Sequence, residues 1–263
     1  MLPRISRVDG DGVDYLLMSG NDAISNIIFR SGSYDSFLKD ISEMFYTEVA
    51  NPIVIDIGAN LGAYSIPVAK DIEAQGGQVI GFEPQRIVYY QLCSNVFINR
   101  LENYIAYQQA VSDATGKIDI PELNYSNCNN IGAFSLDKNY RDRHGLENSV
   151  KAETFTVPVI KLDDLLVDKK VCIIKIDVEG YELNVIKGAR NFLQRHEYPP
   201  FLFEAWDFEW FSNQKIELME YVSSIGYEIS SLNNFNFLAQ HPNHYRKIEV
   251  VNDGSAIKWR KLK

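Results

Sequence analysis

The chain has 263 residues, of which 46% are hydrophobic, and a formal net charge of −9 at pH 7. This length suits one α/β domain with extensions, and the acidic balance argues against a nucleic-acid binder, which needs a basic face for phosphates. The sequence holds no run of about 20 apolar residues that would span a membrane, and its start lacks the apolar core of a secretory signal. Three widely spaced cysteines without a C-x-x-C pair fit a reducing compartment, so we expect a cytoplasmic protein.

The predicted elements alternate in type along the chain. A short strand and two helices come first, over residues 14–18, 23–30 and 34–45. Further strands are expected over 53–57, 78–82, 105–111, 171–176 and 201–206, and further helices over 62–70, 86–98, 181–193 and 216–225. Continuously apolar strands that alternate with amphipathic helices predict a parallel sheet covered on both faces, which is a doubly wound α/β fold.

A polar, asparagine-rich segment over 124–149 interrupts this succession. Short alternating strands flank it, so we interpret residues from about 118 to 160 as an insertion across one edge of the sheet. A functional segment and a plain surface loop both remain open here. The expected organisation is an N-terminal extension over 1–48 that caps the site, a main domain over 49–240 and a tail over 241–263.

The segment IVIDIGANLGAYS carries the first motif, in which Asp56 ends an apolar strand and Gly58 and Gly62 follow. Neither glycine has a Cβ, so the backbone can turn tightly and approach a ligand closely. A dinucleotide fold requires G-x-G-x-x-G, but Asn60 stands where the second glycine belongs. Because Asp56 would repel a pyrophosphate, the bend favours a cationic or neutral ligand such as S-adenosylmethionine. A glycine bend of this kind also occurs in many other α/β proteins.

The next two strand ends support the same ligand. In VIGFEP, Glu83 follows Gly58 by 25 residues, and a carboxylate at that place accepts hydrogen bonds from ribose hydroxyls. Pro84 then stops the strand, because it has no amide hydrogen to pair. In QQAVSD, the small apolar Ala110 and Val111 suit the face of an adenine, and Ser112 suits its polar edge.

The segments IDIGANLGAYS, GFEP, QAVSD, IKLDDLL and IKIDVEGYELNVIKGA together resemble the FkbM family of S-adenosylmethionine-dependent methyltransferases, over roughly residues 50–205. The resemblance implies the Rossmann-like class I methyltransferase fold: a mostly parallel seven-stranded sheet with helices on both faces and an antiparallel last strand. The segments 227–232 and 234–239 fit the terminal hairpin of that fold. The resemblance also implies methylation of a hydroxyl on a sugar, a glycan or a small natural product.

Residue by residue, the resemblance implies that Asp56 and the Gly58–Gly62 loop meet the methionine part of the cofactor. It places Glu83 at the ribose, Ser112 near the adenine, and Asp177 beside the transferable methyl group. The complete expected set of cofactor-binding residues is Asp56, Gly58, Asn60, Gly62, Glu83, Pro84, Ala110, Val111, Ser112 and Asp177.

An alcohol acceptor needs a general base to remove its proton during methyl transfer. The candidates are Asp177 after the strand VCIIKI, Glu204 at the end of FLFE, and His144 in the polar insertion. Histidine has the best-placed pKa, but RDRHGLE is typical of an exposed segment, and Asp177 is the preferred base or acceptor-orienting group. The Asp163–Asp164 pair and the DVE run offer carboxylates, but no spacing demands a metal ion, so no metal site is predicted.

Two other classes of function remain open. An NAD-dependent oxidoreductase uses the same kind of sheet, although the missing glycine and Asp56 speak against it. A catalytically silent binding module is the second, although such a module has no need to keep Asp56, Gly58, Glu83 and Asp177 together. The preferred hypothesis is a methyltransferase that acts on a saccharide or other small molecule, with no nucleic-acid partner and no membrane span.

Overall fold

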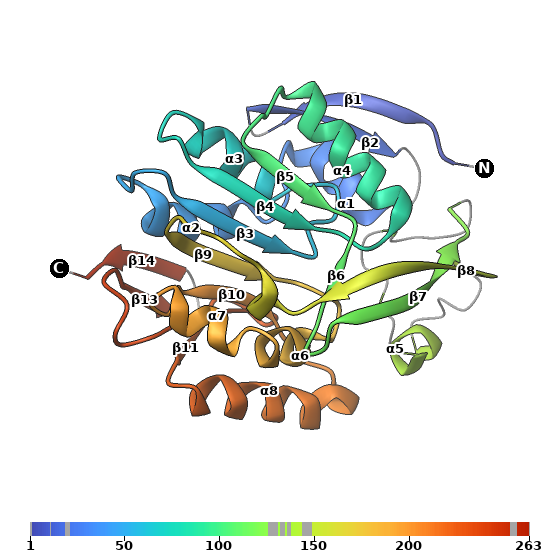
Figure 1. Cartoon of the computed structure of the whole chain (residues 1–263). Coiled ribbons are helices and arrows are strands. Elements are labelled where there is room, and N and C mark those ends of the chain that lie inside the picture. The colour runs from blue at the N-terminus through green and yellow to red at the C-terminus, as the bar shows by residue number, and fades with distance from the viewer. Residues whose placement is uncertain are drawn as a thin grey trace.

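The computed structural model describes residues 2–10, 12–18, 22–125, 131, 135, 138–143, 149–252 and 257–262. Its centre is a seven-stranded sheet in the order β11-β12-β10-β9-β3-β4-β5 (Figure 1). The strands are β3 (Ile53–Ile57), β4 (Gln78–Phe82), β5 (Tyr104–Tyr107), β9 (Val171–Ile176), β10 (Phe201–Glu204), β11 (Glu228–Ser231) and β12 (Asn236–Gln240). The strands from β5 to β10 run parallel, and β12 is antiparallel to both of its neighbours. The class I methyltransferase fold expected from the sequence is therefore confirmed.

Helices cover both faces of this sheet (Figure 1). One face carries α1 (Ala23–Ser31), α2 (Ser36–Tyr46), α3 (Ser65–Glu73) and α4 (Arg86–Ile98), and the other carries α6 (Glu182–Lys187), α7 (Arg190–Arg195) and α8 (Ser212–Ser224). Successive strand side chains point to opposite faces, so Val54 packs in the first core and Ile55 in the second. Both sets are apolar because both faces are buried, which is why these strands lack an alternating pattern.

Two expected helices differ from the structure at a glycine. The helix expected over 62–70 begins only at Ser65, because Gly62 has a φ of 90° and the chain is still turning there. The helix expected over 181–193 is divided into α6 and α7 at Gly188. A Cβ on Gly188 would lie 2.1 Å from the carbonyl oxygen of Ser112. The absence of a side chain at Gly188 therefore allows the two backbones to lie in contact.

The strand expected over 105–111 is also divided. Its first part is β5, whereas β6 (Ala110–Val111) leaves the central sheet and pairs in parallel with β8 (Val150–Ile160). With β7 (Gly116–Leu123), which is antiparallel to β8, they form a three-stranded sheet beside the main one (Figure 1). The predicted insertion supplies β7, β8 and α5 (Lys138–Arg143).

Both ends of the chain form β-hairpins that were not predicted from the sequence. β1 (Ile5–Gly10) pairs with β2 (Val13–Met18), and Asn95 on α4 accepts a 2.6 Å hydrogen bond from the Leu16 backbone. In the tail, β13 (Ile248–Asn252) pairs with β14 (Ile257–Lys261). The Arg246 guanidinium before β13 donates to the carbonyl oxygens of Phe45 and Thr47 at the end of α2. Polar contacts thus fix both hairpins to the helical layer of α2 and α4.

The described residues also form two short 3-10 helices, Leu162–Asp164 and Glu209–Phe211. Among the described residues, no helix combines the length and apolar character needed to cross a bilayer.

Candidate functional site

The parallel register brings four polar or turn residues into one row at the carboxyl edge of the sheet. Ile57, the last residue of β3, is paired with Phe82 of β4 and Ile176 of β9, and Ile176 is paired with Phe203 of β10. The next residue on each strand is therefore part of the same row: Gly58, Glu83, Asp177 and Glu204. Ligands of doubly wound folds bind at this edge.

A pocket of about 340 Å³ opens over this row, a size within the range of small-molecule sites. Its floor contains all four residues of the row. The N-terminal extension contributes Ile24, Tyr34 and Asp35 to the lining, and the insertion contributes Ile120 and Tyr140. The segments before and inside the main domain therefore complete the pocket, while the expected division into three parts stays a prediction.

The glycine turn is held against the neighbouring strand ends. Gly58 has a φ of 84°, and a Cβ there would lie 1.8 Å from the carbonyl oxygen of Asp177. Asn60 has a φ of 52°, a conformation that asparagine tolerates better than most residues, and its Oδ1 accepts a 2.7 Å hydrogen bond from the amide of Leu61. Asn60 therefore adopts a left-handed backbone conformation at the position where a dinucleotide-binding motif has its second glycine.

Glu83 is tied to this turn by its carboxylate. Oε2 accepts from the amide of Asn60 at 2.9 Å, and Oε1 accepts from the amide of Gln85 at 2.8 Å. Burial raises the pKa of Glu83 to about 7, although these two hydrogen bonds favour the charged form. A carboxylate fixed in this way has lone pairs left to accept hydrogen bonds from hydroxyl groups in the pocket.

Lys175 joins two carboxylates across the sheet. It stands opposite Asp56 in the parallel register, so both side chains project from the same face, and its Nζ lies 3.9 Å from Asp56 Oδ1. The same nitrogen donates a 2.8 Å hydrogen bond to Asp177 Oδ2. Asp56 is 0% exposed, and burial raises its pKa. Lys175 and its hydrogen-bond partner Asp177 thus line the pocket, whereas Asp56 is buried outside the lining.

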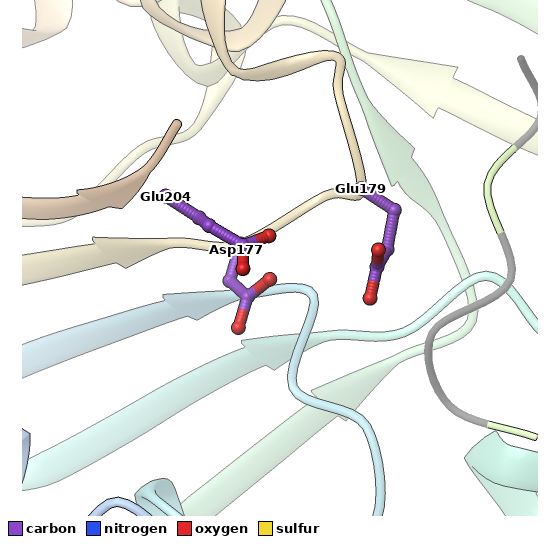
Figure 2. Close-up of side chains that lie close together, drawn as sticks. All are labelled: Asp177, Glu179 and Glu204. Atoms are coloured by element: carbon purple, nitrogen blue, oxygen red, sulfur yellow. The ribbon is translucent and has the colours of Figure 1, made fainter. Parts of the chain in front are cut away.

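Three carboxylates gather at the other end of the row. Those of Asp177, Glu179 and Glu204 each have an oxygen within 4.8 Å of the others. Figure 2 shows these three side chains. The pKa values of Glu179 and Glu204 are raised well above their usual range, first by burial and then by repulsion from neighbouring carboxylates. This cluster is the most acidic part of the pocket.

The loop that carries Asp177 and Glu179 is closed by Glu182. Its Oε1 accepts from the amides of Val178 at 3.0 Å and Gly180 at 3.2 Å, and it is almost fully buried. Burial raises the pKa of Glu182 to about 7. Glu182 therefore shapes the loop and does not line the pocket, although it shares the DVEGYE motif with residues that do.

The structure places the predicted site residues in two groups. Those that line the pocket are Gly58, Asn60, Glu83, Pro84, Asp177 and Glu204. Those that lie outside its lining are Asp56, Gly62, Ala110, Val111 and Ser112. A Cβ on Gly62 would collide with Ile66 on α3 and Leu92 on α4, so the turn packs closely against both helices. His144 is outside the described residues.

Several lining residues did not emerge from sequence reasoning. The signal for Lys175 was present, because it is the single charged residue in the apolar strand VCIIKI. Tyr140 and Phe208 carried no such signal, because an aromatic residue in a polar insertion or a loop is uninformative until the fold brings it to the pocket.

The sequence matches the family described as the methyltransferase FkbM domain over residues 56–229. The methyltransferase sdnD of Sordaria araneosa is 25% identical over 204 residues, which cover 69% of this chain and 74% of that protein. The hexuronic acid methyltransferase AglP of Haloferax volcanii is 26% identical over 160 residues, which cover 59% of this chain and 58% of AglP. This match spans less than two thirds of AglP.

Solved structures of methyltransferases also align with this chain. The methyltransferase FkbM from Methylobacillus flagellatus KT aligns with a TM-score of 0.46 and 19% identity, over 76% of this chain and 47% of that one. An S-adenosylmethionine-dependent O-methyltransferase from Thermotoga maritima aligns with a TM-score of 0.46 and 15% identity, over 98% and 71% of the two chains.

The family match covers more than half of the chain and contains the glycine turn, Glu83 and the DVEGYE motif. The family implies S-adenosylmethionine as the cofactor. The predicted family and enzyme class are confirmed: this chain belongs to the FkbM methyltransferase domain family and is a methyltransferase.

Proposed function

We propose that this enzyme transfers the methyl group of S-adenosylmethionine to a hydroxyl group of a sugar, a glycan or a small natural product. The observation that carries the proposal is the row at the carboxyl edge of the sheet, where a turn without a Cβ and Glu83 stand beside Asp177 and Glu204. One end of this row suits a nucleoside, and the other offers carboxylates to an acceptor.

The donor end fits S-adenosylmethionine by its chemistry. Gly58 and Asn60 would face the methionine part, Glu83 would accept hydrogen bonds from the ribose hydroxyls, and Pro84 would lie against the base. On this side the carboxyl groups of Glu83 and Asp177 line the pocket, and their negative charge would repel a pyrophosphate. When bound, the cofactor supplies an electrophilic methyl group on a sulfonium, which requires an aligned nucleophile.

Asp177 is the proposed base or acceptor-orienting group. It lies in the row next to Gly58, its side chain is 35% exposed to the pocket, and Lys175 fixes its carboxylate. A carboxylate in this place would accept the proton of an acceptor hydroxyl or hold that hydroxyl in line. Glu204 is the second candidate, although its carboxylate already accepts a 3.0 Å hydrogen bond from Trp206 Nε1.

A small polar acceptor agrees with the mixed polar and aromatic lining of the pocket. The relative AglP is named for action on a hexuronic acid, which supports a saccharide acceptor in this family. A cytoplasmic location is proposed from the few, widely spaced cysteines.

The direct test is methyl transfer from isotopically labelled S-adenosylmethionine to a panel of sugars, nucleotide sugars and cell extract fractions. The expected result is label in a product whose fragmentation places the methyl group on oxygen. Label on nitrogen or carbon would overturn the assignment of a hydroxyl acceptor, and absence of transfer from every fraction would count against the proposal as a whole.

A further inference from the structure

The pocket divides into a donor half and an acceptor half along the row of strand ends. Neighbouring strands lie about 4.8 Å apart, and β10 is two strands from β3 and three from β4. Glu204 therefore stands roughly 10 Å from the glycine turn, at the far side of Asp177. Glu179 lies on the loop after β9, and its carboxylate has an oxygen within 4.8 Å of those of both Asp177 and Glu204. Figure 2 shows the three side chains.

The acceptor half contains the carboxyl groups of Glu179 and Glu204 in a part of the pocket that has little positive charge. Lys175 is the one cation among the described residues that line the pocket, and it is engaged by Asp177 and Asp56. Glu204 accepts a hydrogen bond from the neutral Trp206 indole. Burial, followed by repulsion from neighbouring carboxylates, raises the pKa values of Glu179 and Glu204, and the charge of Lys175 opposes the rise in both.

Aromatic rings surround the same two carboxylates. The Tyr140 and Trp206 rings stack with centroids 4.4 Å apart, and both line the pocket together with Phe208. The Trp206 indole of this stack donates a 3.0 Å hydrogen bond to Glu204, and burial, followed by the charges of Glu179 and Glu204, raises the pKa of Tyr140 to about 12. Aromatic faces beside carboxylates form the usual environment of a bound ammonium group.

A separate side chain indicates that the pocket receives a polar ligand. Gln85, which follows Glu83 and Pro84 at the donor end, lines the pocket and is only 7% exposed, and neither atom of its side-chain amide has a hydrogen-bond partner among the described residues. A buried amide without partners is costly unless a ligand supplies them.

We propose that the acceptor carries a protonated amino group, which Glu179 and Glu204 bind beside the rings of Tyr140 and Trp206. The acceptor class is thus a small hydroxylated amine, such as an amino sugar, rather than a neutral or acidic sugar. The inference rests on the proposed function, because it assigns the acceptor half of the same pocket. The ammonium donates hydrogen bonds to both carboxylates and offsets their charge.

The test measures binding of three sugars to the protein saturated with S-adenosylhomocysteine, by titration calorimetry or ligand-observed NMR. The probes are D-glucosamine, N-acetyl-D-glucosamine, which lacks the positive charge, and D-glucuronic acid, which reverses it. We expect D-glucosamine to bind at least about tenfold more tightly than either of the others, as a charge-assisted contact requires. The double variant Glu179→Gln/Glu204→Gln is expected to lose this preference, and Glu220→Gln on the exposed face of α8 to keep it.

Equal affinity for the three sugars, or no binding of D-glucosamine, would overturn the inference. Binding of Mn²⁺ that disappears in the double variant, with no change in sugar preference, would also overturn it by assigning the carboxylates to a metal ion. Saturation with S-adenosylhomocysteine is measured first, so a failure of the proposed cofactor is seen separately from a failure of the amine.

Discussion

The Nζ of Lys175 lies 2.8 Å from Asp177 Oδ2 and holds that carboxylate at the edge of the pocket, while its other neighbour is the fully buried Asp56. Replacing Lys175 by methionine keeps the volume but leaves the Asp56 carboxylate without a cation. We expect Lys175→Met to lower the free energy of unfolding by about 3–5 kcal/mol, the usual cost of breaking a buried ion pair. Urea denaturation measures this change.

Two further variants separate the ion pair from a general effect of losing a lysine. Adding Asp56→Asn to Lys175→Met should recover part of the lost stability, because the uncompensated charge is removed. Lys169→Met, at an exposed position, serves as the matched control and should be nearly neutral. A Lys175→Met protein as stable as the wild type would show that the pair is not needed.

Gly58→Ala tests the close approach of the glycine turn to β9. The new Cβ would lie 1.8 Å from the Asp177 carbonyl oxygen, and a φ of 84° is strained for alanine. We expect a lower melting temperature and loss of S-adenosylhomocysteine binding. Gly116→Ala has no heavy atom within 4 Å of its Cβ and should change neither property. Unchanged cofactor affinity in folded Gly58→Ala would remove the turn from the site.

Asp177→Asn separates catalysis from cofactor binding. The amide has the same shape but cannot take a proton, so turnover should fall by roughly 100-fold or more, the usual contribution of a general base. The affinity for S-adenosylhomocysteine should remain close to that of the wild type, because Glu83 and the glycine turn are intact. Single-turnover kinetics and calorimetry measure the two quantities. Equal losses in both would reassign Asp177 to cofactor binding.

The affinity for the cofactor should depend on pH through Glu83. Burial raises the pKa of this carboxyl to about 7, so it is mostly protonated below that pH and ionised above it. Only the ionised form accepts from two ribose hydroxyls with both oxygens, so S-adenosylhomocysteine should bind more tightly as the pH rises through 7.

Glu83→Gln should bind more weakly and lose most of this dependence, which titrations on both sides of neutrality will show. Glu182 also has a pKa of about 7, and Glu182→Gln serves as the control for its effect on the loop after β9. A pH dependence that survives in Glu83→Gln but disappears in Glu182→Gln would assign the effect to the loop instead.

The strand ends were predictable because they depend on local signals. A carboxylate or glycine that follows an apolar run, as Gly58 and Glu83 do, must reach the edge where parallel strands end. The pairing of Asp56 with Lys175 was not predictable, because it depends on the register between two strands that are far apart in the sequence. The burial of the Asp56 side chain beside Lys175 therefore had no signal in the sequence, and a role for Asp56 at the cofactor stays a prediction.

Two predicted helix boundaries were wrong because the sequence does not show whether a glycine lies within a helix or interrupts it. Gly62 was included in a helix, although its positive φ delays the helix to Ser65, and Gly188 divides a helix that its apolar spacing made continuous. Tyr140 and Phe208 of the acceptor half were missed for another reason. Tyr140 comes from the insertion, and only tertiary packing brings it onto Trp206.

We propose that the turn after β3 and Glu83 together bind S-adenosylmethionine. Calorimetric titration of the purified protein with S-adenosylhomocysteine, and in parallel with NAD⁺, tests this binding. We expect one binding site for S-adenosylhomocysteine, strong weakening in Glu83→Ala and no heat from NAD⁺. Absence of binding by the folded wild type, or NAD⁺ binding that Glu83→Ala abolishes, would contradict this proposal.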